Sequence, residues 1–287
     1  MVGKLRLSLN LGIAALACCL SAHAGPVMMS SWDKLSDRDV GRLGKKVLKA
    51  GESEWAHGET SNFVYHVQSV GDMAGLADEV EYAYRKSSMY LGPSTAREKT
   101  HVFLVSPDTW QRVVRKADRR KDSLAMQAGR NIYVLQSTNP VDNIVWIPHE
   151  IIHLRLWEQY GRNVPVWLDE GLAGCLGWKI AQSYRQKDRL ELVRTLPALK
   201  PGDVKTLDEL TAVKKYPGGP GKAPAFYRQS EELIRAIARK IGYDKLAGFV
   251  KAVAGEGREW DEYLRDRFSF SEFDFKWLKE QAVDGVQ

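Results

Sequence analysis

Two short stretches decide how the chain folds: His149-Glu150-Ile151-Ile152-His153, and Pro165-Val166-Trp167-Leu168-Asp169-Glu170-Gly171-Leu172-Ala173. Residues four apart on an α-helix share one face, so the imidazoles of His149 and His153 can point at a single ion. Glu150 lies one residue further on, rotated by about 100°, and can reach a water molecule beside that ion. The first stretch therefore predicts a metal site on a helix.

The second stretch supplies a third ligand at a suitable distance. Sixteen residues lie between His153 and Glu170. This length allows the first helix to end, the chain to turn between Gly161 and Pro165, and a second helix to begin. The carboxylate of Glu170 would then face back across the helix pair. Imidazole suits zinc, and two histidines with one glutamate leave a fourth position open, as catalytic zinc sites do. We therefore expect one Zn²⁺ per chain.

The two stretches together resemble the gluzincin metallopeptidases, most closely the bacterial peptidase-MA-like group. Members of that group carry HExxH, then a proline, then W-L-x-E-G-x-A. The resemblance is specific over 145–178 and weaker over 62–136 and 225–280. It implies a zincin-like metallopeptidase fold, in which a small N-terminal mixed sheet with helices precedes a mainly helical C-terminal half.

The resemblance also implies an activity. His149, His153 and Glu170 would bind zinc, and Glu150 would be the general base that activates a zinc-bound water. The chain would then be a zinc metallopeptidase that hydrolyses peptide bonds in a peptide or protein substrate.

A second donor is needed for the oxyanion that forms during such a reaction. No histidine follows His153, so a downstream histidine cannot supply it. Gluzincins commonly use a downstream tyrosine, and Tyr227 is the candidate because it follows a glycine-rich loop and begins a helix. Tyr216 is the second choice and Arg228 the third. A core position for Tyr227 is the competing interpretation.

Three residues depart from the family pattern. Pro148 indicates that the zinc helix starts there or is kinked there. Arg155 is charged where the pattern tends to be apolar. Gly174 stands where relatives often place Asp or Ser, so the group that orients a zinc ligand must come from elsewhere, with Asp169 as the candidate. Pro148 and Gly174 motivate an alternative function, a non-catalytic, zinc-stabilised envelope binding protein with a degenerate site.

Strands are expected early in the chain and helices late, which indicates an α+β fold. We expect one catalytic domain over 61–287, made of a strand-rich half at 61–137, zinc helices at 140–185 and a helical half at 186–287. Residues 25–60 would be an N-terminal arm or propeptide. The predicted strands are 63–67, 101–105 and 131–135, and the predicted helices are 72–90, 140–160, 166–185, 225–241, 244–254, 258–267 and 271–282. An extended peptide could add to an edge formed by strand 131–135.

The first 24 residues have the order of a signal peptide. Two cations come first, an apolar run over 7–20 follows, and Ala22-His23-Ala24 supplies a cleavage site. Cleavage after Ala24 would give a periplasmic or secreted protein, and a lipoprotein anchored at Cys18 is the alternative. Cys175 would then be the one remaining cysteine, so we expect a buried thiol and no internal disulfide. No other apolar run is long enough for stable membrane insertion.

The charge balance is mild for 287 residues. There are 42 Lys and Arg against 36 Asp and Glu, a formal net charge of +6. This excludes the concentrated basic stripe of a nucleic-acid-binding protein, and we expect no nucleic-acid partner. The upstream histidines, His57, His66 and His101, lack metal-ligand spacing and are predicted to be surface or strand residues.

Overall fold

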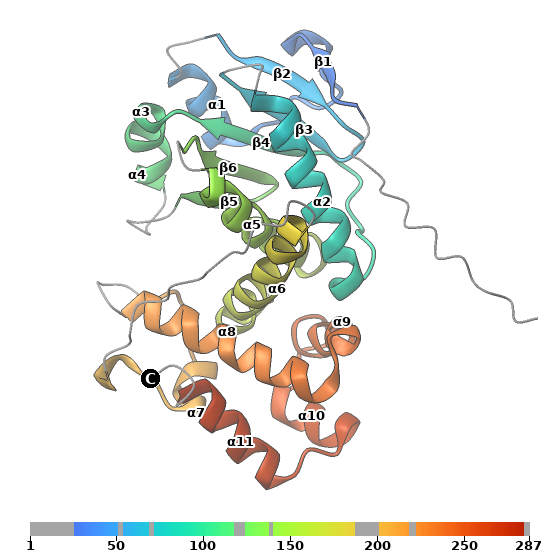
Figure 1. Cartoon of the computed structure of the whole chain (residues 1–287), viewed down its shortest axis with the longest axis vertical. Helices are drawn as coiled ribbons and strands as arrows, with labels where there is room; N and C mark the ends of the chain where they lie inside the picture. Colours follow the sequence, from blue (N-terminus) through green and yellow to red (C-terminus); the bar gives the residue numbers. More distant parts are fainter. Residues whose placement is uncertain are drawn as a thin grey trace, which may run out of the picture.

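The structure is a computed structural model that describes residues 26–50, 54–68, 72–117, 124–137, 140–186, 201–217 and 222–283. The expected signal peptide and the lipoprotein alternative fall on residues 1–24, outside the described residues. Figure 1 shows a sheet domain formed by the N-terminal half and a group of helices formed by the C-terminal half, so the predicted α+β class is confirmed.

Six strands form one mixed sheet. The three strands in its middle are parallel and the outer ones are antiparallel to their neighbours. The strand order is β1 (Met28–Ser30), β2 (Ala56–Glu59), β3 (Phe63–Val67), β4 (Thr100–Val105), β6 (Asn131–Leu135) and β5 (Ala125–Ala128). The three predicted strands are confirmed as β3, β4 and β6.

The prediction that strand 131–135 forms an edge is wrong. This strand, β6, pairs with β4 on one side and with β5 on the other. Strand β5 was missed by the sequence analysis, because its residues, Ala-Met-Gln-Ala, include no β-branched side chain. It nevertheless pairs with β6 and becomes the edge of the sheet.

Helices cover both faces of the sheet. Strand side chains alternate, so that Phe63 and Tyr65 lie on one face with α2 and α5, while Phe103 and Tyr133 lie on the other with α1. The bounds are α1 (Gly41–Ala50), α2 (Met73–Leu91), α3 (Pro107–Thr109), the π-helical turn η3 (Trp110–Val114), α4 (Arg115–Ala117) and α5 (Pro140–Tyr160).

The segment 25–60, which the sequence sets apart as an arm or propeptide, contributes to this sheet. Its strands β1 and β2 pair with each other, and β2 pairs with β3. Its helix α1 packs Val47 into the same apolar cluster as Phe103. These residues therefore belong to the folded sheet domain.

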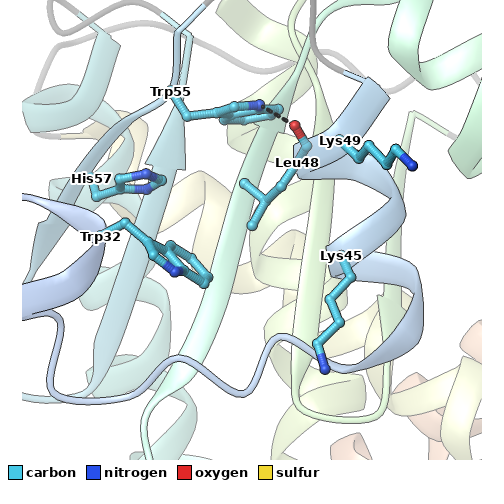
Figure 2. A pocket seen from close by; sticks show the side chains of 6 residues that line it. All are labelled: Trp32, Lys45, Leu48, Lys49, Trp55 and His57. Carbon is cyan, nitrogen blue, oxygen red and sulfur yellow. Dashed lines mark hydrogen bonds between the residues drawn. The ribbon is translucent and has the colours of Figure 1, made fainter.

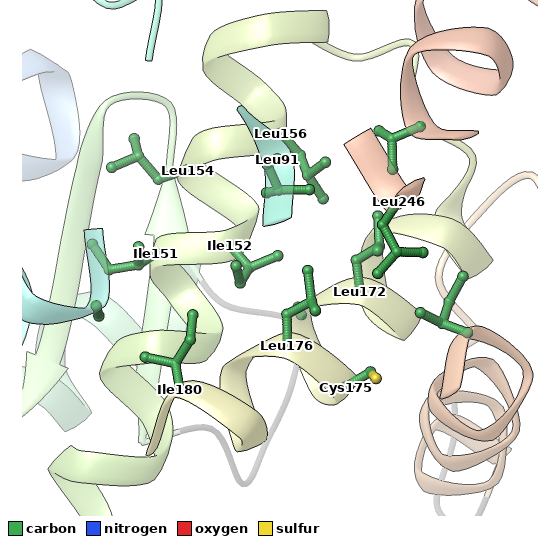
Figure 3. Packing of buried hydrophobic residues seen from close by; sticks show 14 of the residues in the cluster. Leu91, Ile151, Ile152, Leu154, Leu156, Leu172, Cys175, Leu176, Ile180 and Leu246 are labelled. Carbon is green, nitrogen blue, oxygen red and sulfur yellow. The ribbon is translucent and has the colours of Figure 1, made fainter. Parts of the chain in front are cut away.

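The C-terminal half is helical, as predicted. Its elements are α6 (Val166–Gln186), α7 (Leu207–Thr211), α8 (Lys222–Ile241), α9 (Leu246–Val250) with the π-helical turn η6 (Lys251–Gly255), α10 (Trp260–Phe268) and α11 (Glu272–Val283). Apolar side chains of α5, among them Ile152, pack against Leu172 and Leu176 of α6 (Figure 3). Cys175 is buried beside them, as expected, and burial raises the pKa of its thiol to about 11. None of the helices in the described part of the chain has the length and apolar character needed to cross a membrane.

Three histidines form a chain of imidazoles on the sheet face that α1 covers. Nδ1 of His57 lies 2.9 Å from Nδ1 of His66, and Nε2 of His66 lies 2.9 Å from Nδ1 of His101. At the far end, Nε2 of His101 lies 3.5 Å from a carboxylate oxygen of Asp37. His66 and His101 are fully buried, and all three are strand residues as predicted.

Burial keeps these imidazoles neutral. It lowers the pKa of all three, most for His66, where the neighbouring imidazoles add to the effect, whereas Asp37 partly opposes the shift at His101. An unfolded histidine has an ordinary pKa near 6.5. Below that pH the unfolded chain therefore binds more protons than the folded chain. The stability contributed by the neutral imidazoles is present above about pH 6.5 and is lost as the pH falls toward the lowered pKa values.

We expect the free energy of unfolding to fall as the pH drops from 8 to 5.5, and to fall less when two of these imidazoles are removed. Urea unfolding of the parent and of a His66→Phe/His101→Phe variant, both in excess EDTA to remove bound metal, measures this difference. An equal pH dependence in the two proteins would show that the imidazole chain does not govern the acid sensitivity.

Candidate metal centre

The helix that carries His149 and His153 begins well before them. Helix α5 runs from Pro140 through Pro148 to Tyr160, which confirms the predicted helix 140–160. Of the two interpretations of Pro148, a helix start at this residue is therefore wrong. Helix α6 approaches closely at this point. A Cβ atom on Gly177 would lie 2.9 Å from Cα of His149, so only glycine fits here. Pro148 and His149 therefore lie at the closest contact between the two helices.

The three predicted metal ligands lie together. Nε2 of His149 and Nε2 of His153 are 3.1 Å apart, and each is 3.6 Å from Oε2 of Glu170. In a tetrahedral zinc site with bonds of about 2.0–2.1 Å, two ligand atoms are about 3.3 Å apart. The observed separations bracket this value, so the cluster can hold a metal ion. His149 is the most exposed of the three, at 17 % of its side chain, and is the side from which a fourth ligand can enter.

Asp169 orients one of the ligands. Its Oδ1 lies 2.7 Å from Nδ1 of His153, and this bond directs Nε2 of the same ring toward Glu170. Carboxylates play this part beside many metal-binding histidines. The structure thus places Asp169 where the sequence analysis suggested the orienting group could be.

The carboxylates of Asp169 and Glu170 give the centre negative charge. Burial of His153 disfavours its charged form, but Asp169 and Glu170 outweigh burial and raise its pKa well above the usual value. Burial of Glu170 likewise opposes ionisation, but His153 and His149 outweigh it and hold the pKa of Glu170 below its usual range. The pair is stable in its ionised form, and the same negative charge favours a bound cation.

Glu150 lies between the metal ligands and the edge of the sheet. Its side chain is buried, and its Oε2 accepts a 2.6 Å hydrogen bond from the backbone N–H of Gln127 in β5. Leu135 donates to the carbonyl of Leu124, which fixes the alternation of hydrogen-bonded pairs along β5 and β6. By that alternation the N–H of Gln127 points away from β6. The side of β5 that no described strand pairs with therefore faces Glu150.

Of the three candidate oxyanion donors, Tyr216 has a direct connection to the centre. Its hydroxyl donates a 2.9 Å hydrogen bond to Oδ2 of Asp169. Tyr227 lies half-buried on α8, with its ring centroid 5.9 Å from that of Phe226, and Arg228 follows it on the same helix. The roles of Tyr227 and Arg228 stay predictions.

The packing of the helices explains Arg155 and Gly174, the two other residues that depart from the family pattern. Arg155 is fully buried, donates a 2.7 Å hydrogen bond to the carbonyl of Gly92, and lies 4.9 Å above the ring of Tyr84. It therefore ties α5 to the end of α2. A Cβ atom on Gly174 would lie 2.7 Å from a carboxylate oxygen of Glu231, so glycine makes room for that buried side chain of α8.

The sequence analysis missed Gln127 as part of the site. Its contribution is a backbone N–H, which no side-chain pattern reveals. The short interval between the Gly129-Arg130 turn and the predicted strand 131–135 was the one available signal for a hairpin partner.

We expect the parent chain to retain about one equivalent of metal after incubation with zinc and dialysis, and the Glu170→Ala variant to retain much less. Asp169→Asn should keep the three ligands but weaken binding by about 10- to 100-fold, because the bond that orients His153 is altered. Elemental analysis and competition with a chromogenic chelator measure both effects.

Glu262→Ala is a suitable control, because Glu262 is exposed on α10. It should bind metal like the parent. Full occupancy in Glu170→Ala, with circular dichroism showing an intact fold, would contradict the assignment of Glu170 as a ligand.

Comparison with known proteins leaves the chain unassigned to a family. No protein-family model matches it, and no curated protein matches it. Its function is therefore argued from the geometry of the centre formed by His149, His153, Glu170 and Glu150.

Proposed function

We propose that the chain is a zinc-dependent metallopeptidase of the gluzincin type, with a zincin-like fold. The observation that carries this proposal is that Glu150 follows His149 of the three-residue metal cluster on α5 and accepts a hydrogen bond from β5, the edge strand of the described sheet. A base, a metal site and a strand edge that can hold an extended peptide are the parts that metal-assisted peptide hydrolysis needs. The signal-like segment at 1–24 supports an exported, periplasmic or secreted, location.

His149, His153 and Glu170 would hold the zinc ion. When bound, zinc acts as a Lewis acid that polarises a carbonyl group and lowers the pKa of water. Two histidines and one glutamate are the donor set of several catalytic zinc sites, and they leave one position open. Asp169 keeps His153 in the tautomer that can bind the ion, because the Nδ1–H of that ring donates to the carboxylate.

Glu150 would be the general base and then the general acid. Its Oε2 is held by the N–H of Gln127, and no hydrogen bond among the described residues engages its Oε1. That oxygen can accept a proton from the attacking water and pass it to the leaving amine. Burial of Glu150 keeps bulk water away from this transfer.

The substrate would add to the sheet as a further strand beside β5. The outward N–H and carbonyl groups of a strand edge bind an extended peptide through main-chain hydrogen bonds, which require no particular side chains. The N–H of Gln127 is donated to Glu150, and the carbonyl of Gln127 points to the same side of β5, so a peptide that pairs with this carbonyl would pass directly beside the base. This placement favours cleavage within an extended segment of a peptide or protein.

The alternative is a non-catalytic zinc-stabilised binding protein, which Pro148 and Gly174 suggested because they depart from the family pattern. Pro148 lies inside a continuous helix, and Gly174 accommodates Glu231. Both residues thus have explanations within the packing that do not require a degenerate site. The alternative differs from the peptidase in one measurable respect, since it predicts metal binding without turnover.

We expect Glu150→Gln to lower peptide hydrolysis by at least about 100-fold while retaining metal, because the amide cannot accept the proton. Fluorescein-labelled casein and a mixture of internally quenched peptides serve as probes. Metal content and the thermal unfolding midpoint are measured on the same preparation.

Glu158→Gln is the matched control, because Glu158 lies on the same helix, is largely buried and bonds to Ser94 rather than to the metal centre. Its activity should stay near that of the parent. A zinc-loaded parent that cleaves neither probe, or a Glu150→Gln variant as active as the parent, would argue against the peptidase.

Substitution of Tyr216 and of Tyr227 should affect different measured quantities, namely metal binding and kcat. Tyr216→Phe removes the donor to Asp169 and should weaken metal binding several-fold, through the orientation of His153. Tyr227→Phe should lower kcat by about 10²- to 10³-fold with metal binding unchanged if its hydroxyl stabilises the oxyanion. A loss of kcat in Tyr216→Phe at full metal occupancy would instead assign Tyr216 as that donor.

A further inference from the structure

A second site of defined chemistry lies on the face of the sheet opposite the metal helices. A pocket of about 410 Å³ opens between α1 and β2. Its lining is Trp32, Lys45, Leu48, Lys49, Trp55 and His57 (Figure 2), and we call it the tryptophan pocket. The metal ligands belong to α5 and α6, whereas this pocket belongs to the α1 side, so the proposed peptidase does not use it.

The two indoles that flank the pocket are partly exposed but held in place. The indole N–H of Trp55 donates a 3.1 Å hydrogen bond to the carbonyl of Leu48, and its ring meets the edge of Phe103. The ring of Trp32 lies 5.3 Å from His57 and 5.8 Å from His66, measured between centroids. Rigid, partly exposed aromatic faces bind the apolar face of a ring at low conformational cost.

The charged side chains that line this pocket and the neighbouring cleft are basic. Lys45 and Lys49 lie one turn apart on α1 and are exposed. A second cleft, the basic cleft, continues from the pocket because Lys49 lines both, and it also contains Lys46, Arg112 and Lys116. Among the described residues, no acidic side chain lines the pocket or the cleft, although Arg112 forms an ion pair with Asp108. Such a surface attracts a ligand that carries several negative charges.

The imidazole chain gives the pocket a hydrogen-bond acceptor. The hydrogen bond from the backbone N–H of Asp39 and the charge of Arg130 outweigh partial burial and hold the pKa of Asp37 below its usual value, so Asp37 is ionised. An ionised carboxylate favours a proton on the nitrogen that faces it, so we place the proton of His101 on Nε2, which lies 3.5 Å from Oδ1 of Asp37 without forming a hydrogen bond. Nδ1 of His101 then accepts from Nε2–H of His66, and Nδ1 of His66 accepts from Nδ1–H of His57. His57 is left with a lone pair on Nε2, which no hydrogen bond among the described residues engages.

We propose that this surface binds an acidic polysaccharide. A pyranose ring would lie against Trp32 and Trp55 in the tryptophan pocket, with a hydroxyl group donating to Nε2 of His57. Carboxylates on the following sugars would lie along Lys49 and the other cations of the basic cleft. A single-stranded nucleic acid fits less well, because its bases require aromatic side chains repeated along the basic groove, and here both indoles lie at one end.

Binding of trigalacturonate to the full chain tests this proposal. Tryptophan fluorescence and calorimetry should show saturable binding of about one ligand per chain. Lys45→Gln/Lys49→Gln should weaken it by about tenfold or more, and so should Trp55→Leu. Lys276→Gln/Lys279→Gln is the control, because it removes the same charge from exposed positions on α11 and should leave binding unchanged.

Two further ligands test separately whether binding depends on the sugar rings and on the negative charge. The neutral trisaccharide maltotriose should bind at least tenfold more weakly than trigalacturonate, because it lacks the carboxylates. Oligothymidylate of equal charge should also bind more weakly. The proposal is overturned if trigalacturonate does not bind saturably, if oligothymidylate binds as tightly, or if the lysine variants on α1 and α11 behave alike. Unchanged binding by Trp55→Leu with an intact fold would overturn it as well.

Discussion

The close approach of α6 to its two neighbours is the constraint on which the metal centre depends. Gly177 allows α6 to contact the backbone of α5 at His149, and Gly171 allows it to contact the carbonyl of Ser230 on α8, where a Cβ atom would lie only 2.5 Å away. A side chain at either position would push a helix outward. Glu170 directly precedes Gly171 on α6, so the position of its carboxylate relative to the imidazoles depends on these contacts. Metal geometry tolerates displacements of only about 0.5 Å, and backbone contacts of this kind supply that accuracy.

A second long-range contact joins this helix pair to the sheet. The register of β5 on β6 determines which amides face outward, and the packing of α5 on the sheet places Glu150 against one of them. A shift of one residue in the register would turn the N–H of Gln127 toward β6 and remove the bond to Glu150. The position of the Glu150 carboxylate therefore depends on strand pairing as much as on the helix that carries it.

The sequence predicted the parts of the fold that have strong local signals. Buried parallel strands such as β3 and β4 are runs of β-branched and aromatic residues, and the metal ligands lie on helices with regular spacing. Strand β5 has no such signal, so the edge of the sheet was assigned to the wrong strand. The need for glycine at Gly174 depends on Glu231, 57 positions later, and only the packed structure brings them together.

The imidazole chain shows the same limit, because His57, His66 and His101 come from three different strands. Their spacing in the sequence suggested no common role. The strand register places His57 directly opposite His66, and the parallel pairing of β3 with β4 brings His101 next to them. Side-chain clusters that arise from sheet pairing are therefore visible only once the strand order is known.

Two buried histidines show how the fold uses one residue type in opposite ways. His153 and His66 are both shielded from water, yet the pKa of His153 is raised and that of His66 is lowered. The difference lies in their partners, because His153 faces the carboxylates of Asp169 and Glu170, whereas His66 faces two neutral imidazoles. The protonated imidazole is stabilised at the first position and disfavoured at the second. Neighbouring carboxylates therefore give these two buried imidazoles opposite protonation preferences.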